Sequence, residues 1–203
     1  MTTIILVRHG QTAWNREERF RGQADIPLND IGIEQAKTTA ERIARQYRPT
    51  AIYASPLQRT MKTAQIIAHP LGLSVIHHPD LLDIHYGSFA GLTGEEARAQ
   101  WPKINTGWLT TPGSVTFPDG ESLSVLRIRV ERFMREMSAS HTDETIAAVG
   151  HTVANRVILL SALGLDDNRL WDLGQDNCAI NLLEYENNHW RVLSINDTGH
   201  LVN

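Results

Sequence analysis

A cation, an imidazole and a glycine follow one another at Arg8, His9 and Gly10, directly after the apolar run 4–7. An apolar run with β-branched members is typical of a buried strand, and in open α/β sheets ligands bind beyond the carboxyl ends of the strands. A guanidinium can hold an oxyanion through two parallel hydrogen bonds, and an imidazole can act as a nucleophile. We expect Gly10 to let the backbone turn closely around a bound group. The alternative is a strand end that carries Arg8 and His9 on a solvated rim.

The same chemistry recurs after two later apolar runs. His151 follows the run 145–150, and Arg59 comes shortly after the run 51–54. A carboxylic acid, Asp83, stands at the start of an irregular stretch. If the strands are parallel, their carboxyl ends bring two imidazoles, two guanidiniums and one carboxyl to the same rim. Because phosphoryl transfer depends on positioning and on the neutralisation of charge, these residues predict that reaction.

Apolar runs and helical periodicities alternate along the chain, and this order predicts the elements that carry those residues. Strands are expected near 3–9, 51–54, 73–78 and 145–150, and a terminal hairpin at 178–186 and 189–195. Helices are expected near 32–47, 57–70 and 152–163, and a further long helix is expected after Glu121 and Ser122. Such alternation is typical of an α/β fold in which helices cover both faces of a mostly parallel sheet. We expect one domain over 1–203, long enough to bury a sizeable core.

Residues 80–120 interrupt this alternation, and we call them the cap segment. They are rich in glycine and proline, carry Trp101, Trp108 and Phe117, and are expected to include a short helix near 93–101. A solvated linker carries fewer large aromatic side chains, so we interpret the segment as an insertion over a pocket. The three aromatic side chains favour an apolar or ring-bearing leaving group, or they form the core of the cap itself.

Composition and charge narrow the function classes. The chain has 203 residues, 41% of them hydrophobic and 21% charged, with a formal net charge of −4. This balance gives no support for nucleic-acid binding, so an anionic substrate must be held by local arginines. A single cysteine, Cys178, excludes an intramolecular disulfide and a cysteine-based metal site. With no signal-peptide pattern and no apolar stretch of about 18 residues, we expect a cytoplasmic enzyme with no membrane partner.

Beyond these patterns, the segment 6–15 reads LVRHGQTAWN. It resembles the signature of a known family, the histidine phosphatase superfamily, which includes the cofactor-dependent phosphoglycerate mutases. Similar blocks follow in the family's order at 19–22, 25–28, 55–59, 86–87, 91–93, 120–123 and 149–151. The resemblance covers essentially the whole chain. It implies a three-layer α/β/α fold and catalysis through a phosphohistidine.

The resemblance also implies roles for individual residues. His9 matches the nucleophile that accepts the phosphoryl group. Arg8, Arg59 and His151 match the groups that hold the phosphate oxygens, and Asn15 matches a further phosphate donor from the first loop. Since the arginines neutralise the charge, we expect no metal and no cofactor.

Asp83 stands where the family usually has Glu, and it would be the general acid despite a side chain one methylene shorter. Protonated Asp83 would give its proton to the departing alkoxide, and would then activate the water that hydrolyses the phosphohistidine. A free Asp, with a pKa of ~3.9, is mostly ionised near neutrality, but a bound phosphate dianion disfavours a second negative charge and raises that pKa. Glu95 and Glu121 are the alternative acids.

A second departure is Arg21, where family members often have Gln, Ser or Thr. An arginine there adds positive charge at the mouth of the site and suggests a substrate with a second anionic group. The alternative is an exposed loop arginine. We expect Asn15, Arg21, Gly22 and Thr152 to bind the substrate.

Two enzymatic functions and one silent function fit these residues. The first is a phosphomonoesterase acting on a small phosphorylated metabolite. The second is a phosphoglycerate mutase, but that branch commonly has Arg after the acid, where this chain has Ile84, and a basic pair further along, where residues 94–118 contain only Arg98 and Lys103. The third is a silent phosphate-binding module, which the retained charged residues disfavour. The natural ester is left open, as is a homodimer.

Overall fold

The central sheet has six strands in the order β3-β2-β4-β1-β5-β6 in the computed structural model, which describes residues 1–201. The strands are β1 (Thr2–Arg8), β2 (Ala51–Ala54), β3 (Val75–His77), β4 (Thr145–Gly150), β5 (Ile180–Glu186) and β6 (His189–Asp197). β1 to β4 are mutually parallel, and the hairpin β5–β6 adds antiparallel strands at one edge. The expected mostly parallel sheet and terminal hairpin are therefore confirmed.

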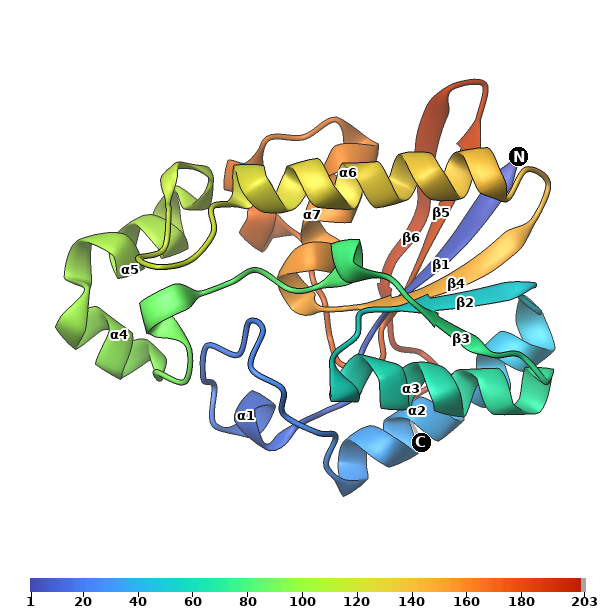
Figure 1. Ribbon diagram of the computed structural model, residues 1–203, viewed down its shortest axis with the longest axis horizontal. Coiled ribbons are helices and arrows are strands. Elements are labelled where there is room, and N and C mark those ends of the chain that lie inside the picture. Colours follow the sequence, from blue (N-terminus) through green and yellow to red (C-terminus); the bar gives the residue numbers. More distant parts are fainter. Residues whose placement is uncertain (202–203) are drawn as a thin grey trace.

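Helices cover both faces of this sheet, as Figure 1 shows. They are α1 (Ala13–Arg16), α2 (Asp30–Gln46), α3 (Gln58–Ala68), α4 (Gly94–Gln100), α5 (Pro102–Thr110), α6 (Leu123–Ser140) and α7 (Thr152–Leu163). Side chains that alternate along β1 face opposite layers: Ile5 and Val7 pack with α2 and α3, whereas Ile4 and Leu6 pack with α6 and α7. The three-layer α/β/α architecture is confirmed.

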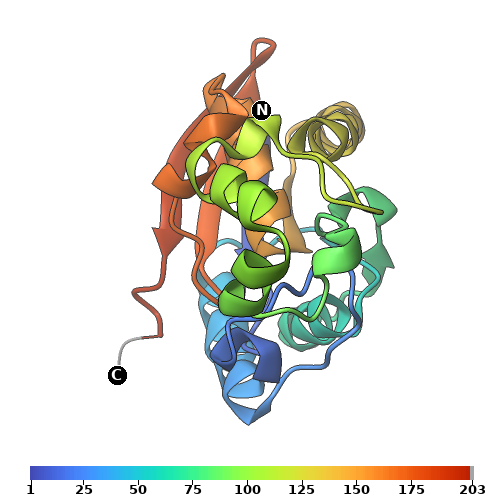
Figure 2. The same cartoon turned by 90° about the vertical axis from the view of Figure 1, so that its left-hand side faces the viewer.

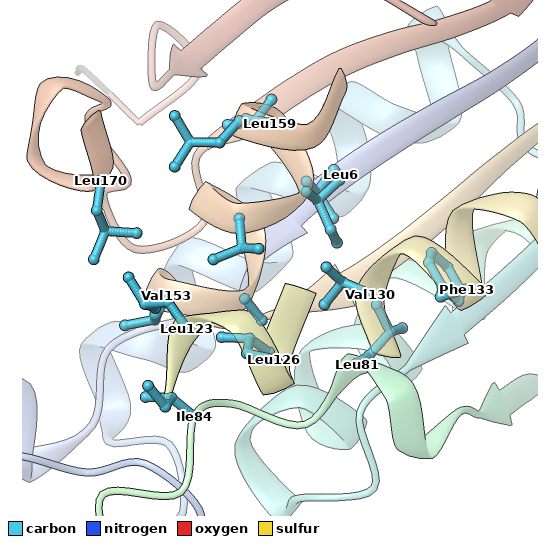
Figure 3. Packing of buried hydrophobic residues seen from close by; sticks show 14 of the residues in the cluster. Leu6, Leu81, Ile84, Leu123, Leu126, Val130, Phe133, Val153, Leu159 and Leu170 are labelled. Carbon is cyan, nitrogen blue, oxygen red and sulfur yellow. The ribbon is translucent and has the colours of Figure 1, made fainter. Parts of the chain in front are cut away.

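The apolar core on the α6–α7 side reaches into the segment that carries Asp83. Leu81 and Ile84 are fully buried there, against Leu126 and Val153 of the helices. Figure 3 shows these side chains converging from separate elements. Because its neighbours on both sides are anchored in the core, Asp83 is held in place by packing as well as by its own contacts.

The strand register brings the sequence-predicted residues to one edge. Arg8 at the end of β1 lies opposite Gly150 at the end of β4, and Ala54 at the end of β2 lies opposite Val149. The residues that follow these three strands therefore emerge together. None of the helices within residues 1–201 is long and apolar enough to cross a membrane.

The cap segment contains α4, which was expected, and α5, which was not. Figure 2 shows both helices in front of the sheet when the molecule is viewed from the cap side. Trp108 and Phe117 are 2% and 1% exposed and belong to the apolar core, with Trp101 packed against it. The cap aromatics are thus mainly core residues, and only Trp108 among these three also lines the cavity described below.

Candidate active site

His9, directly after β1, is buried, and one nitrogen of its ring carries no hydrogen. Its Nδ1 lies 2.6 Å from the carbonyl oxygen of Gly10, which can only accept, so Nδ1 carries the hydrogen. Burial, followed by the positive charges of Arg59 and Arg8, lowers the pKa of His9 well below its usual range. The imidazole is therefore neutral near pH 7, and its Nε2 has a free lone pair.

The backbone of His9 is fixed by hydrogen bonds at both its N–H and its carbonyl. Its N–H donates to the Gly150 carbonyl at 3.1 Å, and the Asn177 amide donates to the His9 carbonyl at 3.0 Å. The following glycine is required for a different reason than expected. A Cβ on Gly10 would lie 2.4 Å from the carbonyl oxygen of Gly32 in α2, so the close approach is to a helix and not to a bound group.

Arg8 is a buried cation without a carboxylate partner among residues 1–201. Its Nη1 donates to the Gln175 carbonyl, its Nε has no protein partner, and the side chain lines the cavity. Burial lowers the pKa of the guanidinium to about 9, which leaves it charged at neutral pH. An uncompensated buried charge is costly, so this group is suited to an anionic ligand.

Arg59 on α3 is fully buried and also has neutral partners. It donates to the carbonyls of Gly22 and Ala24, both at 2.6 Å, and through Nε to His151 Nδ1 at 3.2 Å. Burial lowers the pKa of Arg59 to about 10. The His151 ring centroid lies 5.3 Å from that of His9, so the two imidazoles of the predicted set are neighbours.

Asp83 is a buried carboxyl at the same site. Its Oδ1 accepts a hydrogen bond of 3.3 Å from the backbone of Ala154, and burial raises its pKa against the opposing charges of Arg59 and Arg21. Its own carbonyl accepts from Arg129 at 2.8 Å. A raised pKa keeps the group protonated to higher pH, as a proton donor requires.

The two alternative acids have other environments. Glu121 forms an ion pair of 3.0 Å with Arg129 and accepts from the backbone of His85. Glu95 is exposed in the first turn of α4. These environments favour Asp83 as the acid.

These groups adjoin an open cavity of about 660 Å³. Its lining includes Arg8, Asn15, Arg21, Gly22, Asp83 and Thr152, six of the nine residues expected at the site. The other three, His9, Arg59 and His151, are buried and adjoin residues of the lining. Asn177 donates to the His9 carbonyl, Arg59 donates to the Gly22 carbonyl, and His151 precedes Thr152. All nine are therefore brought to one region of the molecule.

The expected substrate-binding residues are oriented by local structure. Asn15 uses its Oδ1 to accept from Thr12 in the cap of α1, so its amide nitrogen is the outward end. Thr152 has a buried hydroxyl that finds no hydrogen-bond partner within the described part of the chain, residues 1–201. Arg21 is half-buried and donates to the carbonyls of Trp14 and Arg19, both at 3.2 Å, so it is not a freely exposed loop arginine.

Sequence reasoning missed part of the cavity wall. Tyr86, Leu109 and Trp171 line it, and Trp171 is fixed by an Nε1–H donation of 2.7 Å to the carbonyl of Trp108. Tyr86 had a signal, because it belongs to one of the family-like blocks. Leu109 and Trp171 had none, because their positions depend on how the cap folds.

No group of three or more His, Cys, Asp or Glu within residues 1–201 is arranged to hold a metal ion.

Comparison with known proteins assigns the family. Residues 4–198 match the model of the histidine phosphatase superfamily, branch 1. The chain belongs to this superfamily. It is 35% identical to phosphoserine phosphatase 1 of Hydrogenobacter thermophilus over 99% of this chain and 95% of that protein. It is 34% identical to a probable phosphoglycerate mutase of Yersinia pestis over 99% and 95% of the two chains.

The fold assignment agrees with a solved structure. YhfR of Bacillus stearothermophilus superimposes with a TM-score of 0.94 over the full length of both chains, at 25% identity. The predicted family and fold are thus confirmed, and the enzyme is a phosphatase of the histidine phosphatase superfamily.

Proposed function

We propose that this phosphatase hydrolyses its ester through a covalent phosphohistidine on His9. The observation that carries the proposal is the neutral His9 imidazole, whose Nε2 has a free lone pair and which lies near two buried cations, Arg8 and Arg59, that have no carboxylate partner among residues 1–201. Nε2 attacks phosphorus in line with the leaving oxygen, while Arg8 and Arg59 neutralise the charge on the equatorial oxygens. Asn15 and Thr152 donate further hydrogen bonds to those oxygens.

Asp83 supplies the proton that the leaving group needs. The P–O bond to the leaving group breaks as the proton passes from the Asp83 carboxyl to the departing oxygen. The carboxylate then takes a proton from a water molecule, whose oxygen attacks phosphorus and breaks the P–N bond to His9. Inorganic phosphate leaves, and the carboxyl is protonated again.

The substrate class that we propose is a small phosphate monoester with a second anionic group, such as phosphoserine. The name of the Hydrogenobacter relative supports phosphoserine. The charge around the cavity supports a second anion, since Arg21 adds a cation without an ion-pair partner among residues 1–201 to those of Arg8 and Arg59. A phosphate dianion neutralises two of these three charges.

The covalent step is tested by rapid-quench labelling with a ³²P-labelled monoester on the wild type and on His9→Ala. We expect an acid-labile, base-stable adduct on His9 in the wild type. In His9→Ala we expect no adduct and a loss of turnover of ~10³-fold or more. Isomerisation of 3-phosphoglycerate is measured in parallel, because a mutase uses the same intermediate.

Label on another residue, or near-normal turnover by a folded His9→Ala, would contradict the phosphohistidine proposal. Isomerisation as fast as phosphate release would contradict hydrolysis as the main reaction and favour the mutase. Circular dichroism of the variant serves as the folding control.

A further inference from the structure

Both ring nitrogens of His151 already have protein partners. Nδ1 lies 3.2 Å from Arg59 Nε, and Nε2 lies 2.8 Å from the hydroxyl oxygen of Ser55. An arginine Nε–H can only donate, so Nδ1 must be the nitrogen with the lone pair. The neutral ring then carries its hydrogen on Nε2, which donates to Ser55 Oγ. Two contacts from two different segments fix one tautomer.

The neighbouring His9 has the opposite tautomer. Its Nδ1 carries the hydrogen and donates to Gly10, and its Nε2 has the lone pair. In each ring the N–H donates to an uncharged acceptor: a backbone carbonyl for His9 and a serine hydroxyl for His151. The tautomer decides which nitrogen of each ring can donate a hydrogen bond and which has the lone pair that accepts one or attacks.

We infer that Ser55 is a positioning residue of the reaction: it holds His151 as the Nε2–H tautomer, so that Nδ1 accepts from and orients Arg59. This inference rests on the proposed function, in which Arg59 neutralises charge on the transferred phosphoryl group. In the other tautomer, an Nδ1–H would point at the Arg59 guanidinium. The contact between Arg59 and His151 would then be lost.

Ser55 is itself rigidly placed. It is fully buried directly after β2, where its N–H donates to the Val149 carbonyl at 3.1 Å and its carbonyl accepts from the Thr60 hydroxyl at 2.8 Å. Ser55 follows β2 and His151 follows β4, so the parallel pairing of these two strands places the Ser55 hydroxyl next to His151. A mobile side chain could not select a tautomer in this way.

The charges that face His151 explain why a neutral partner is needed. They come from Arg59 on α3, Arg129 on α6 and Arg21 in the loop after α1. Burial first, and then these cations and the neighbouring His9 ring, lower the pKa of His151. A carboxylate in place of Ser55 would stabilise the doubly protonated ring, which has no lone pair for Arg59. A hydroxyl accepts the Nε2 hydrogen without doing so.

The test is Ser55→Ala, read by two-bond ¹H–¹⁵N correlation spectra of ¹⁵N-histidine-labelled protein. His151 is assigned by comparison with the spectrum of His151→Asn. We expect the wild type to show the Nε2–H pattern and Ser55→Ala to lose it, because a buried N–H without an acceptor is costly. Loss of a partner that orients a functional histidine costs about 10- to 100-fold in metal sites, and we expect a fall of that size in kcat/KM.

Two further variants separate positioning from general structural damage. Thr60→Val removes the hydroxyl that donates to the Ser55 carbonyl but removes no partner of His151. Because the Ser55 N–H still donates to the Val149 carbonyl, this variant should keep the Nε2–H pattern and most of the activity. Ser55→Thr retains the hydroxyl and should restore both the pattern and part of kcat/KM. An unchanged His151 pattern in a folded Ser55→Ala would overturn the inference, as would a changed pattern with unchanged kcat/KM. Labelling of His9 in Ser55→Ala would still report on the proposed function independently.

Discussion

The anion-binding end of the site (Arg8, His9, Arg59 and His151) and the mouth of the cavity are built by different means. The four residues of the anion-binding end are at most 8% exposed and lie on or directly beyond elements of the central sheet layers. At the mouth, Leu109 and Trp171 are 63% and 39% exposed and come from α5 and the 3₁₀ helix Asp167–Asp172. Residues fixed by strand register can hold a reacting group, whereas residues on the cap can differ between relatives without disturbing the chemistry.

The anion-binding end also concentrates unfavourable electrostatics. Two buried guanidiniums have neutral partners, and the pKa of each is lowered by burial. Asp83 beside them has a raised pKa. Buried cations that are placed to bind an anion lower the stability of the protein when no anion is bound. This cost is a general feature of preorganised active sites.

The largest effect among the following predictions is expected at the anion-binding end, from Asp83→Asn. If Asp83 is the acid, an alkyl phosphate should be cleaved ~10²–10⁴-fold more slowly, because its alkoxide must leave unprotonated. With an activated aryl phosphate, the rate of the first step, in which the phosphoryl group passes to His9, should fall much less. Both substrates are measured on the wild type and the variant. Small, equal losses would exclude Asp83 as the proton donor.

The raised pKa of Asp83 adds a pH dependence of known sign. The protonated form is the active one, so kcat/KM for an alkyl phosphate should fall as the pH rises through the pKa of Asp83 in the folded enzyme. Burial of the ionised Asp83 carboxylate should also lower the free energy of unfolding at high pH, because a raised pKa means that the folded state favours the protonated form. Asp83→Asn should therefore have a higher Tm than the wild type at pH 8, and this difference in Tm should be smaller at pH 4.

At the mouth, Arg21→Gln should affect substrates selectively. A hydrogen bond to a charged group contributes about 1.5–3 kcal/mol, so kcat/KM for phosphoserine should fall by roughly 10- to 100-fold. For phosphoethanolamine, which lacks the carboxylate, kcat/KM should fall much less. Arg19→Gln is the matched control, because Arg19 already pairs with Glu17 at 2.6 Å. Equal losses on both substrates would show that Arg21 binds the phosphate and not the second anion.

A smaller loss, about tenfold in kcat/KM for an alkyl phosphate, is expected from Arg129→Met. Arg129 donates to the carbonyls of Asp80 and Asp83 at 3.0 and 2.8 Å, and so fixes the backbone of the acid. Misplacement of a catalytic group by a fraction of an ångström is enough for such a loss. The ratio of alkyl to aryl rates should fall, as in Asp83→Asn but less.

The control for this variant lies on the same helix. Arg127 donates to Asp167, Ser161 and Leu165 and is similarly buried, but it does not contact the segment of Asp83. Arg127→Met should lower Tm comparably and leave the rate ratio unchanged. If both variants lowered the ratio equally, the effect of Arg129 would be general destabilisation.

The difference between the two regions also explains what the sequence could predict. Arg8, His9 and His151 lie at or directly after short apolar runs that predict buried strands, so parallel pairing of those strands predicted their convergence. Asp83 has no such signal, and its assignment depended on the resemblance. The role of Ser55 could not be foreseen, because the tautomer of His151 is set by side chains from two other segments.

The cap was predictable only in outline. α5 (Pro102–Thr110) contains Gly107 and several threonine and asparagine residues, which are weak helix formers, so its helix depends on packing of Trp108 into the core. Trp171 lies far from the cap segment in sequence, and its ring meets Trp108 at a centroid distance of 5.2 Å. No local pattern could reveal that pairing.

The smallest expected effect is that of metal removal, and it tests whether the guanidiniums suffice at the anion-binding end. In metal-dependent phosphoryl transfer, the ion neutralises the oxygens that Arg8 and Arg59 would neutralise here. Exhaustive dialysis against EDTA and 1,10-phenanthroline should therefore leave kcat and KM within about twofold of their starting values. Contaminating metal-dependent phosphatases are measured with His9→Ala purified in parallel. A loss of activity in the wild type that one divalent cation restores, with no such response in His9→Ala, would show that the arginines do not carry the charge alone.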